Sequence, residues 1–111
     1  CGLFSNHDVL ADSLIRSGSK TYERVWRLPL YDEYRDHLKS DIADMKNSAG
    51  RSASSITAAM FLQEFVGSTP WAHLDIASTA YLSDKKRYHP KYATGFGVRL
   101  LVDLLSSETE L

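Results

Sequence analysis

The chain has 111 residues, of which 43% are hydrophobic and 24% are charged, and its formal net charge is −1. This length and composition are typical of one globular domain, while the near-neutral charge gives no basic field for a phosphate backbone, so we expect no nucleic acid partner. The sequence also lacks the run of roughly 20 apolar residues that a membrane helix needs and the basic, apolar start of a signal peptide, so we expect a cytoplasmic protein with no membrane partner.

The chain begins with its only cysteine, Cys1. One cysteine can form neither an internal disulfide nor a zinc site built from cysteines. An N-terminal thiol can act as a nucleophile beside its own amine. The favoured interpretation is simpler. Because the first residue is not methionine and Gly2–Phe4 resembles sequence from the middle of a protein, we expect a piece of a longer chain.

Four elements are predicted in the first half of the chain. A capped helix is expected over Asn6–Ser17, with Gly18 as its stop. Alternating apolar residues predict a strand over Val25–Leu30, which is placed at a sheet edge because it contains a proline. A short charged helix is expected over Tyr31–Leu38, followed by a strand candidate over Asp41–Met45.

The second half is more apolar. A serine-rich loop precedes a helix over Ser54–Val66, which is apolar nearly all round and must therefore be covered. The next segments are a mostly apolar strand over Trp71–Ser78, a tyrosine-rich basic loop over Tyr81–Tyr92, and an amphipathic helix over Gly95–Leu105. The acidic tail, Ser106–Leu111, is expected to fray. The stripe expected to face the core on the last helix consists of Val98, Leu101, Val102 and Leu105.

The alternation of strands and helices predicts an α/β fold, with helices packed on a mixed, mainly parallel sheet. We expect residues 1–111 to form one partial domain. Three recognisable strands are too few to cover a helix as apolar as Ser54–Val66. The sequence therefore predicts that the chain belongs to a larger body.

His73 and Asp75 lie two residues apart on the predicted strand, so their side chains share one face. They could serve a site at the end of the strand, or they could satisfy each other within the core. A metal centre would need further ligands, and the nearest candidates, Asp41 and Asp44, lie in another element and are expected to face solvent or cap a turn. A serine, His73 and Asp75 could form a triad on paper, but no nucleophile elbow supports it.

Two other patterns leave alternatives open. Gly95–Gly97, at the start of a helix, could offer backbone N–H groups to an anion, but it lacks the third glycine of a dinucleotide motif and is favoured as a close-packing site. The loop Lys85–His89 mixes basic and aromatic residues, as single-stranded nucleic acid sites do. Because the overall charge does not support that function, a solvated loop is favoured.

Several segments, in order and in register over nearly the whole chain, resemble the carboxyl-terminal part of the leucyl aminopeptidase (cytosol aminopeptidase) family. The resemblance implies the C-terminal portion of an α/β catalytic domain in a two-metal exopeptidase, usually a hexamer, that removes N-terminal residues from peptides. The segments are Arg24–Leu30 with Asp32–Tyr34, Ser40–Asn47, Gly50–Arg51 leading to Ile56–Leu62, Trp71–Ala77, and Ala93–Val98.

The resemblance also implies what this chain lacks. The family's metal-binding lysine and carboxylates precede the matched region, so no catalytic or metal-binding residue is expected here. The two divalent ions, zinc or manganese, belong to the full-length enzyme, where they activate water and clamp the substrate amine and the developing oxyanion. The chain alone is therefore expected to be inactive.

By the same resemblance, residues at the carboxyl end of the predicted Trp71–Ser78 strand line the pocket for the first side chain of the substrate. In this chain these positions are Ala77 and Ala80, whose small size suits leucine-like groups. The alternative is that both alanines are plain packing residues. Ser78 replaces the family's usual glycine, and Ser52–Ser55 is more polar than the family pattern. A different class of function, a stand-alone interaction domain without catalysis, remains the second hypothesis.

Overall fold

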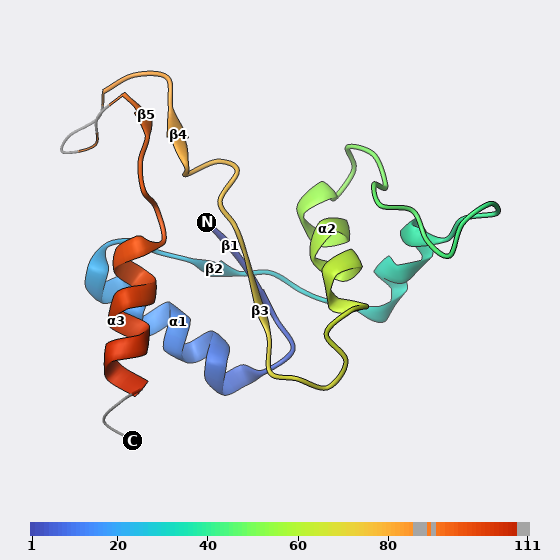
Figure 1. Ribbon diagram of the computed structural model, residues 1–111, viewed down its shortest axis with the longest axis horizontal. Coiled ribbons are helices and arrows are strands. Elements are labelled where there is room, and N and C mark those ends of the chain that lie inside the picture. Colours follow the sequence, from blue (N-terminus) through green and yellow to red (C-terminus); the bar gives the residue numbers. More distant parts are fainter. Residues whose placement is uncertain (86–88, 90, 109–111) are drawn as a thin grey trace.

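The computed structural model describes residues 1–85, 89 and 91–108, and it has three layers (Figure 1). A three-stranded sheet lies in the middle, with α1 and α3 on one face and α2 and η1 on the other. The helices are α1 (Asp8–Thr21), α2 (Ser54–Gln63), α3 (Val98–Glu108) and the 3₁₀ helix η1 (Asp32–Leu38), and the strands are β1 (Gly2–Ser5), β2 (Trp26–Arg27), β3 (Ala72–Asp75), β4 (Tyr81–Leu82) and β5 (Tyr92–Ala93).

The sheet has the order β2-β1-β3, with β1 parallel to β2 and antiparallel to β3. The α/β class and a mixed sheet are thus confirmed. This three-stranded sheet has one parallel and one antiparallel pairing, so the described part of the chain does not show the mainly parallel sheet that was expected. The central strand, β1, is absent from the sequence-based prediction. It has four residues, which is too short a run to display a period.

Strand β1 contributes to the core on both of its faces. Leu3 and Phe4 are fully buried, and because strand side chains alternate they point to opposite layers. Leu3 joins the cluster under α1 and α3, which also includes Ala11, Leu14, Leu100 and Leu104. Phe4 faces the α2 layer, in which Ala59 and Met60 are fully buried. A four-residue strand therefore holds both layers together.

The side chain of Asn6 fixes the antiparallel pairing of β1 with β3. Its Nδ2 donates to the Thr69 carbonyl at 3.0 Å, and its Oδ1 accepts from the Trp71 backbone N–H at 2.8 Å. The Ser5 hydroxyl donates to the Trp71 carbonyl at 2.7 Å. These bonds join the end of β1 to the residues just before β3, although the two segments are about 65 positions apart in sequence. They therefore help to fix which residues of β1 and β3 face each other.

Helix α1 ends later than predicted. It continues through Gly18 to Thr21 and stops at Tyr22, which adopts the left-handed conformation with φ 62°. The prediction that Gly18 ends the helix is therefore wrong. The glycine is needed for packing instead: a Cβ at position 18 would lie 2.8 Å from the Glu23 carbonyl oxygen and 3.2 Å from Leu100 Cδ1.

Helix α3 also differs from the prediction. Its buried residues are Leu100 and Leu104, whereas the predicted stripe of Val98, Leu101, Val102 and Leu105 is exposed. The helix extends to Glu108, so the expected fraying of the tail is wrong for 106–108, and 109–111 lie outside the described residues. Both faces of the helix are apolar, and its periodicity could not show which of them α1 covers.

The remaining elements are close to their predicted places. Strand β2 is shorter than predicted, and so is β3, because the chain turns at Ile76 and residues 77 and 78 lie outside the strand. The element η1 is a 3₁₀ helix where a short helix was expected, and α2 ends at Gln63, three residues early. The segment 41–45 forms bends, not a strand, because the Ser40 hydroxyl accepts from the N–H groups of Ile42 (3.3 Å) and Ala43 (3.2 Å). The predicted loop 81–92 includes the short antiparallel pair β4–β5.

Ion pairs connect helices within each layer. Lys20 Nζ lies 2.6 Å from Asp103 Oδ1 and joins α1 to α3, and its hydrogen bond holds the pKa of Asp103 below the ordinary value. Arg35 pairs with Glu64 and joins η1 to the end of α2. No helix in the part of the chain that the structure describes is long and apolar enough to cross a membrane.

Candidate functional site

Ala77 and Ala80, the two predicted substrate-facing residues, lie in one tight turn that follows β3. Asp75 Oδ1 accepts from the Ala77 backbone N–H at 3.0 Å. The Ile76 carbonyl accepts from the N–H groups of Thr79 at 3.0 Å and Ala80 at 2.8 Å. Ala77 is exposed and Ala80 is half-buried. Three hydrogen bonds from backbone N–H groups therefore hold the turn that carries both alanines.

Thr94 ties this turn to the start of α3. Its hydroxyl donates to the Thr79 carbonyl at 2.6 Å and accepts from the Phe96 backbone N–H at 3.2 Å. Its own backbone N–H donates to the Ala80 carbonyl at 3.0 Å. Thr94 thus bonds to the turn through both its side chain and its backbone.

Glu23 holds the start of α3 itself. Its side chain is 3% exposed, and its Oε2 accepts from the backbone N–H groups of Gly97 at 3.0 Å and Leu100 at 2.9 Å. Arg99 Nε donates to Glu23 Oε1 at 3.1 Å. A carboxylate is favoured here because the first N–H groups of a helix lack partners within the helix and carry partial positive charge.

This contact answers the question left open at Gly95–Gly97. The backbone N–H of Gly97 does bind an anion, but the anion is a carboxylate of the same chain. The close packing predicted for these glycines is wrong, because a Cβ added at Gly95 or Gly97 would meet no described atom within 4 Å. Their φ angles of 68° and 100° favour glycine instead, so the chain can turn sharply into α3. Neither Glu23 nor Thr94 was predicted as important, because each acts on residues far from it in sequence.

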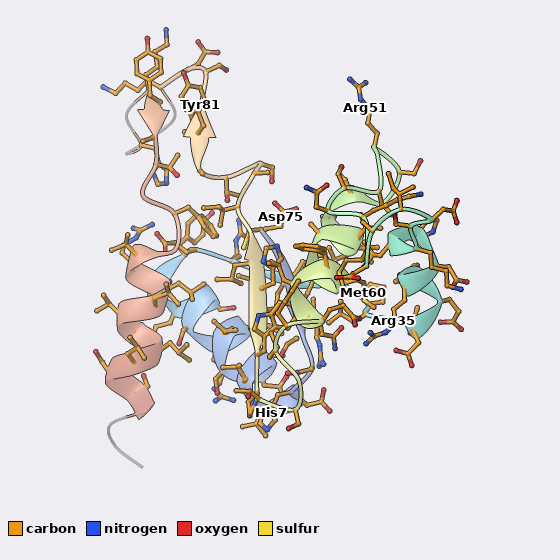
Figure 2. All side chains as sticks on the ribbon, turned by 45° about the vertical axis from the view of Figure 1, so that its right-hand side comes forward. His7, Arg35, Arg51, Met60, Asp75 and Tyr81 are labelled. Atoms are coloured by element: carbon orange, nitrogen blue, oxygen red, sulfur yellow. The ribbon has the colours of Figure 1, made fainter. Side chains whose placement is uncertain are left out.

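The residues His73 and Asp75 have separate structural roles. Both lie on the face of β3 opposite Leu74, as the alternation predicted. The His73 ring stacks on Trp71 with centroids 6.2 Å apart and lies 6.0 Å from the Phe4 ring. Asp75 closes the turn through Ala77, at the end of β3 from which the chain rises to Tyr81 (Figure 2). These contacts support a half-buried histidine that packs on aromatic rings and an aspartate that caps the turn.

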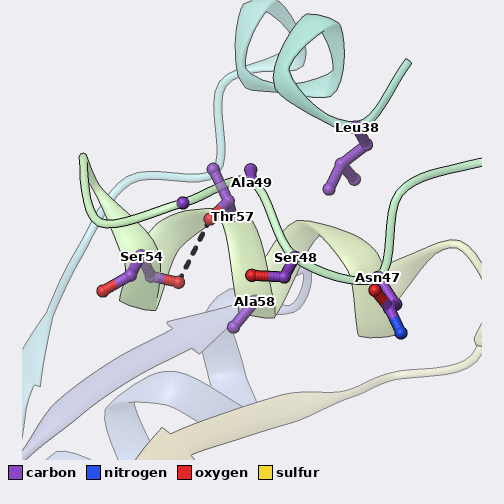
Figure 3. A pocket seen from close by; sticks show the side chains of 8 residues that line it. Leu38, Asn47, Ser48, Ala49, Ser54, Thr57 and Ala58 are labelled. Carbon is purple, nitrogen blue, oxygen red and sulfur yellow. Dashed lines mark hydrogen bonds between the residues drawn. The ribbon is translucent and has the colours of Figure 1, made fainter. Parts of the chain in front are cut away.

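A pocket of about 230 Å³ lies between the end of η1 and the start of α2 (Figure 3). Its polar groups are hydroxyls and one amide, and Thr57 donates from its hydroxyl to the Ser54 carbonyl at 3.2 Å. The pocket includes no predicted site residue. It is lined by Leu38, Asn47, Ser48, Ala49, Gly50, Ser54, Thr57 and Ala58.

Two apolar surfaces are left open outside these sites. One is the exposed stripe of α3 that begins at Val98. The other is an apolar groove of about 660 Å³ beside β2, where Trp26 is 78% exposed. Exposed apolar surfaces of this kind indicate contact with further protein. The basic loop Lys85–His89 falls largely outside the described residues.

Comparison with known proteins decides the family. Residues 1–102 match the catalytic domain of the cytosol aminopeptidase family. The chain belongs to this family. A probable cytosol aminopeptidase of Protochlamydia amoebophila is 62% identical over 105 residues, which cover 94% of this chain and 21% of that protein. Its counterpart in Roseiflexus castenholzii is 56% identical over 110 residues, covering 98% and 22%.

Solved structures of the family have the same fold. The cytosol aminopeptidase of Coxiella burnetii superposes with a TM-score of 0.86 at 40% identity, covering 96% of this chain and 23% of that one. The bottromycin maturation enzyme BotP, in complex with Mn, superposes with a TM-score of 0.90 at 40% identity, covering 97% and 24%. The chain thus spans about a fifth of the length of the curated relatives it matches.

The side chains described here do not fit the metal of such an enzyme. Among the described residues, no group of three His, Cys, Asp or Glu side chains could hold an ion. Asp41 and Asp44 are exposed in the bends between η1 and α2. Arg51 points away from the rest of the molecule (Figure 2).

Proposed function

We propose that residues 1–111 form the C-terminal part of the catalytic domain of a leucyl aminopeptidase. The full-length enzyme removes N-terminal residues from peptides in the cytoplasm, uses two divalent ions, zinc or manganese, and assembles as a homo-hexamer. The ions are held by residues outside this segment. The observation that carries the proposal is the match of residues 1–102 to the family's catalytic domain.

The open surfaces support a place within a larger body. Trp26 and the exposed stripe of α3 offer apolar area that further chain would cover. The strands β2 and β3 are both edges of the described sheet, so each has an unpaired side available for hydrogen bonding. We infer that they continue into the mixed, mainly parallel sheet of the full catalytic domain.

Within that domain, Ala77 and Ala80 line the pocket for the first side chain of the substrate. Their small size leaves room for a leucine-like group, and an apolar methyl lining suits such a side chain. The exposure of Ala77 and the half-burial of Ala80 in one hydrogen-bonded turn are consistent with a fixed pocket wall.

One comparison of two proteins tests this function. The full-length protein, loaded with manganese or zinc, should hydrolyse leucine p-nitroanilide at a rate typical of enzymes, of the order of 1 s⁻¹ or faster. Residues 1–111, assayed alone with the same metals, should give no release above the blank, because the described side chains offer no metal site. Turnover by the isolated segment, or an inactive full-length protein, would contradict the proposal.

Enlarging the pocket wall should change substrate preference. In the full-length enzyme, Ala80→Leu or Ala77→Val should lower kcat/KM for leucine p-nitroanilide by roughly 10- to 100-fold, because even one methylene in an apolar pocket changes discrimination by 10-fold or more. The alanine substrate should lose less. Ala43→Leu, in an exposed bend, is the matched control and should leave both values unchanged. Equal losses for both substrates would argue for plain packing residues.

A further inference from the structure

We propose that Thr94 is a positioning residue for substrate selection: its hydroxyl fixes the turn that presents Ala77 and Ala80, and thereby sets which first side chains the enzyme accepts. This inference rests on the proposed function. Thr94 itself is placed between β5 and α3, and it acts through the backbone of the turn.

Thr94 donates hydrogen bonds to the carbonyls of the last two residues of the turn. Its hydroxyl donates to the Thr79 carbonyl at 2.6 Å, and its backbone N–H donates to the Ala80 carbonyl at 3.0 Å. The Ile76 carbonyl accepts hydrogen bonds from the N–H groups of the same two residues, Thr79 and Ala80. With donors and acceptors bonded on both sides, the turn has little freedom to shift.

The position of Thr94 is set by the core of the molecule. Its hydroxyl accepts from the Phe96 N–H, and the next residue, Gly97, donates to the buried carboxylate of Glu23. Leu100, one turn into α3, is fully buried and bonds to the same carboxylate. The turn is therefore braced against a buried anchor, and not against a mobile surface loop.

The hydroxyl, and not the bulk of the side chain, is the critical group. Valine has nearly the shape of threonine, but it can neither donate to the Thr79 carbonyl nor accept from Phe96. The half-buried carbonyl would then lose its partner, and the turn would relax toward water to recover one. Serine keeps the hydroxyl and lacks only a methyl group, so it should preserve the brace.

The experiment uses the full-length, metal-loaded enzyme with Thr94→Val, Thr94→Ser and the control Thr21→Val. Thr21 also donates from its hydroxyl to a carbonyl, that of Ser17 at 2.8 Å, but within α1. Hydrogen exchange of the amides in 76–82 reports the brace without requiring activity. The ratio of kcat/KM for leucine and alanine p-nitroanilides reports selection.

For Thr94→Val we expect exchange at 76–82 to become about tenfold faster and the leucine-to-alanine ratio to change by about five- to tenfold, as expected for one lost hydrogen bond of ordinary net strength. Thr94→Ser and Thr21→Val should stay within about twofold of the wild type by the same reasoning. Thr94→Ala provides a second test of the lost hydroxyl if the valine variant does not fold.

Unchanged exchange in the valine and alanine variants would overturn the inference, and so would faster exchange with an unchanged substrate ratio. The alanine variants test the proposed substrate pocket independently of Thr94. If Ala80→Leu changes the ratio and Thr94→Val does not, only the role of Thr94 fails. If neither Ala77→Val nor Ala80→Leu changes it, the pocket assignment fails, and the role of Thr94 in selection fails with it.

Discussion

Replacing Glu23 by alanine should lower the free energy of unfolding by about 3 kcal/mol, because two backbone N–H groups at the start of α3 would lose a charged partner in a buried place. The carboxylate is 3% exposed and accepts from Gly97, Leu100 and Arg99. A hydrogen bond to a charged group contributes more than a neutral one, and water has little access to replace it. Helix α3 should therefore loosen first.

Hydrogen exchange of the amides in 97–104 of the full-length protein, measured over a series of urea concentrations, gives this loss. Glu23→Gln keeps the shape and one acceptor oxygen but removes the charge, so it should lose about half as much as the alanine variant. Glu33→Ala, an exposed glutamate in η1, is the matched control and should stay within about 0.5 kcal/mol of the wild type. A loss below about 1 kcal/mol for Glu23→Ala would contradict the anchoring role.

The second large effect is expected at Gly18, where alanine should destabilise the fold by about 2 kcal/mol. In an ordinary helix interior the same change stabilises by about 1 kcal/mol. Here the added Cβ would lie 2.8 Å from the Glu23 carbonyl oxygen, a backbone atom that cannot move without shifting the turn after α1. The cost of overpacking, typically 1–3 kcal/mol, should outweigh the gain in helix propensity.

The same exchange measurement tests Gly18→Ala, with Ser19→Ala as its neighbour on the exposed side of α1. The control should be neutral or slightly stabilising, because alanine is the better helix former. Since the clash falls on the residue that anchors α3, the double variant with Glu23→Ala should lose less than the sum of the two single changes. A stabilised Gly18→Ala protein would show that the Glu23 carbonyl can move away from a Cβ at position 18 at little cost.

Hydrophobic periodicity predicted the long elements of the fold but missed a short strand and the buried face of one helix. The hydrophobic pattern located α1, α2, β3 and α3, because long or strongly apolar segments have a clear period. It could not locate β1, whose four residues are too few to show one. It selected the wrong face of α3, because Leu100 and the stripe from Val98 are both apolar and only the packing of α1 distinguishes them.

The sequence by itself determined the family and the α/β class, because several segments keep their order and spacing along the chain. It also placed Ala77 and Ala80 at the carboxyl end of a predicted strand. Only the tertiary structure showed that Glu23 anchors α3 and that Thr94 braces the turn. The physical reason is distance along the chain: a hydrogen bond between residues 15 or 74 positions apart leaves no local pattern, since its partners meet only after the layers have packed.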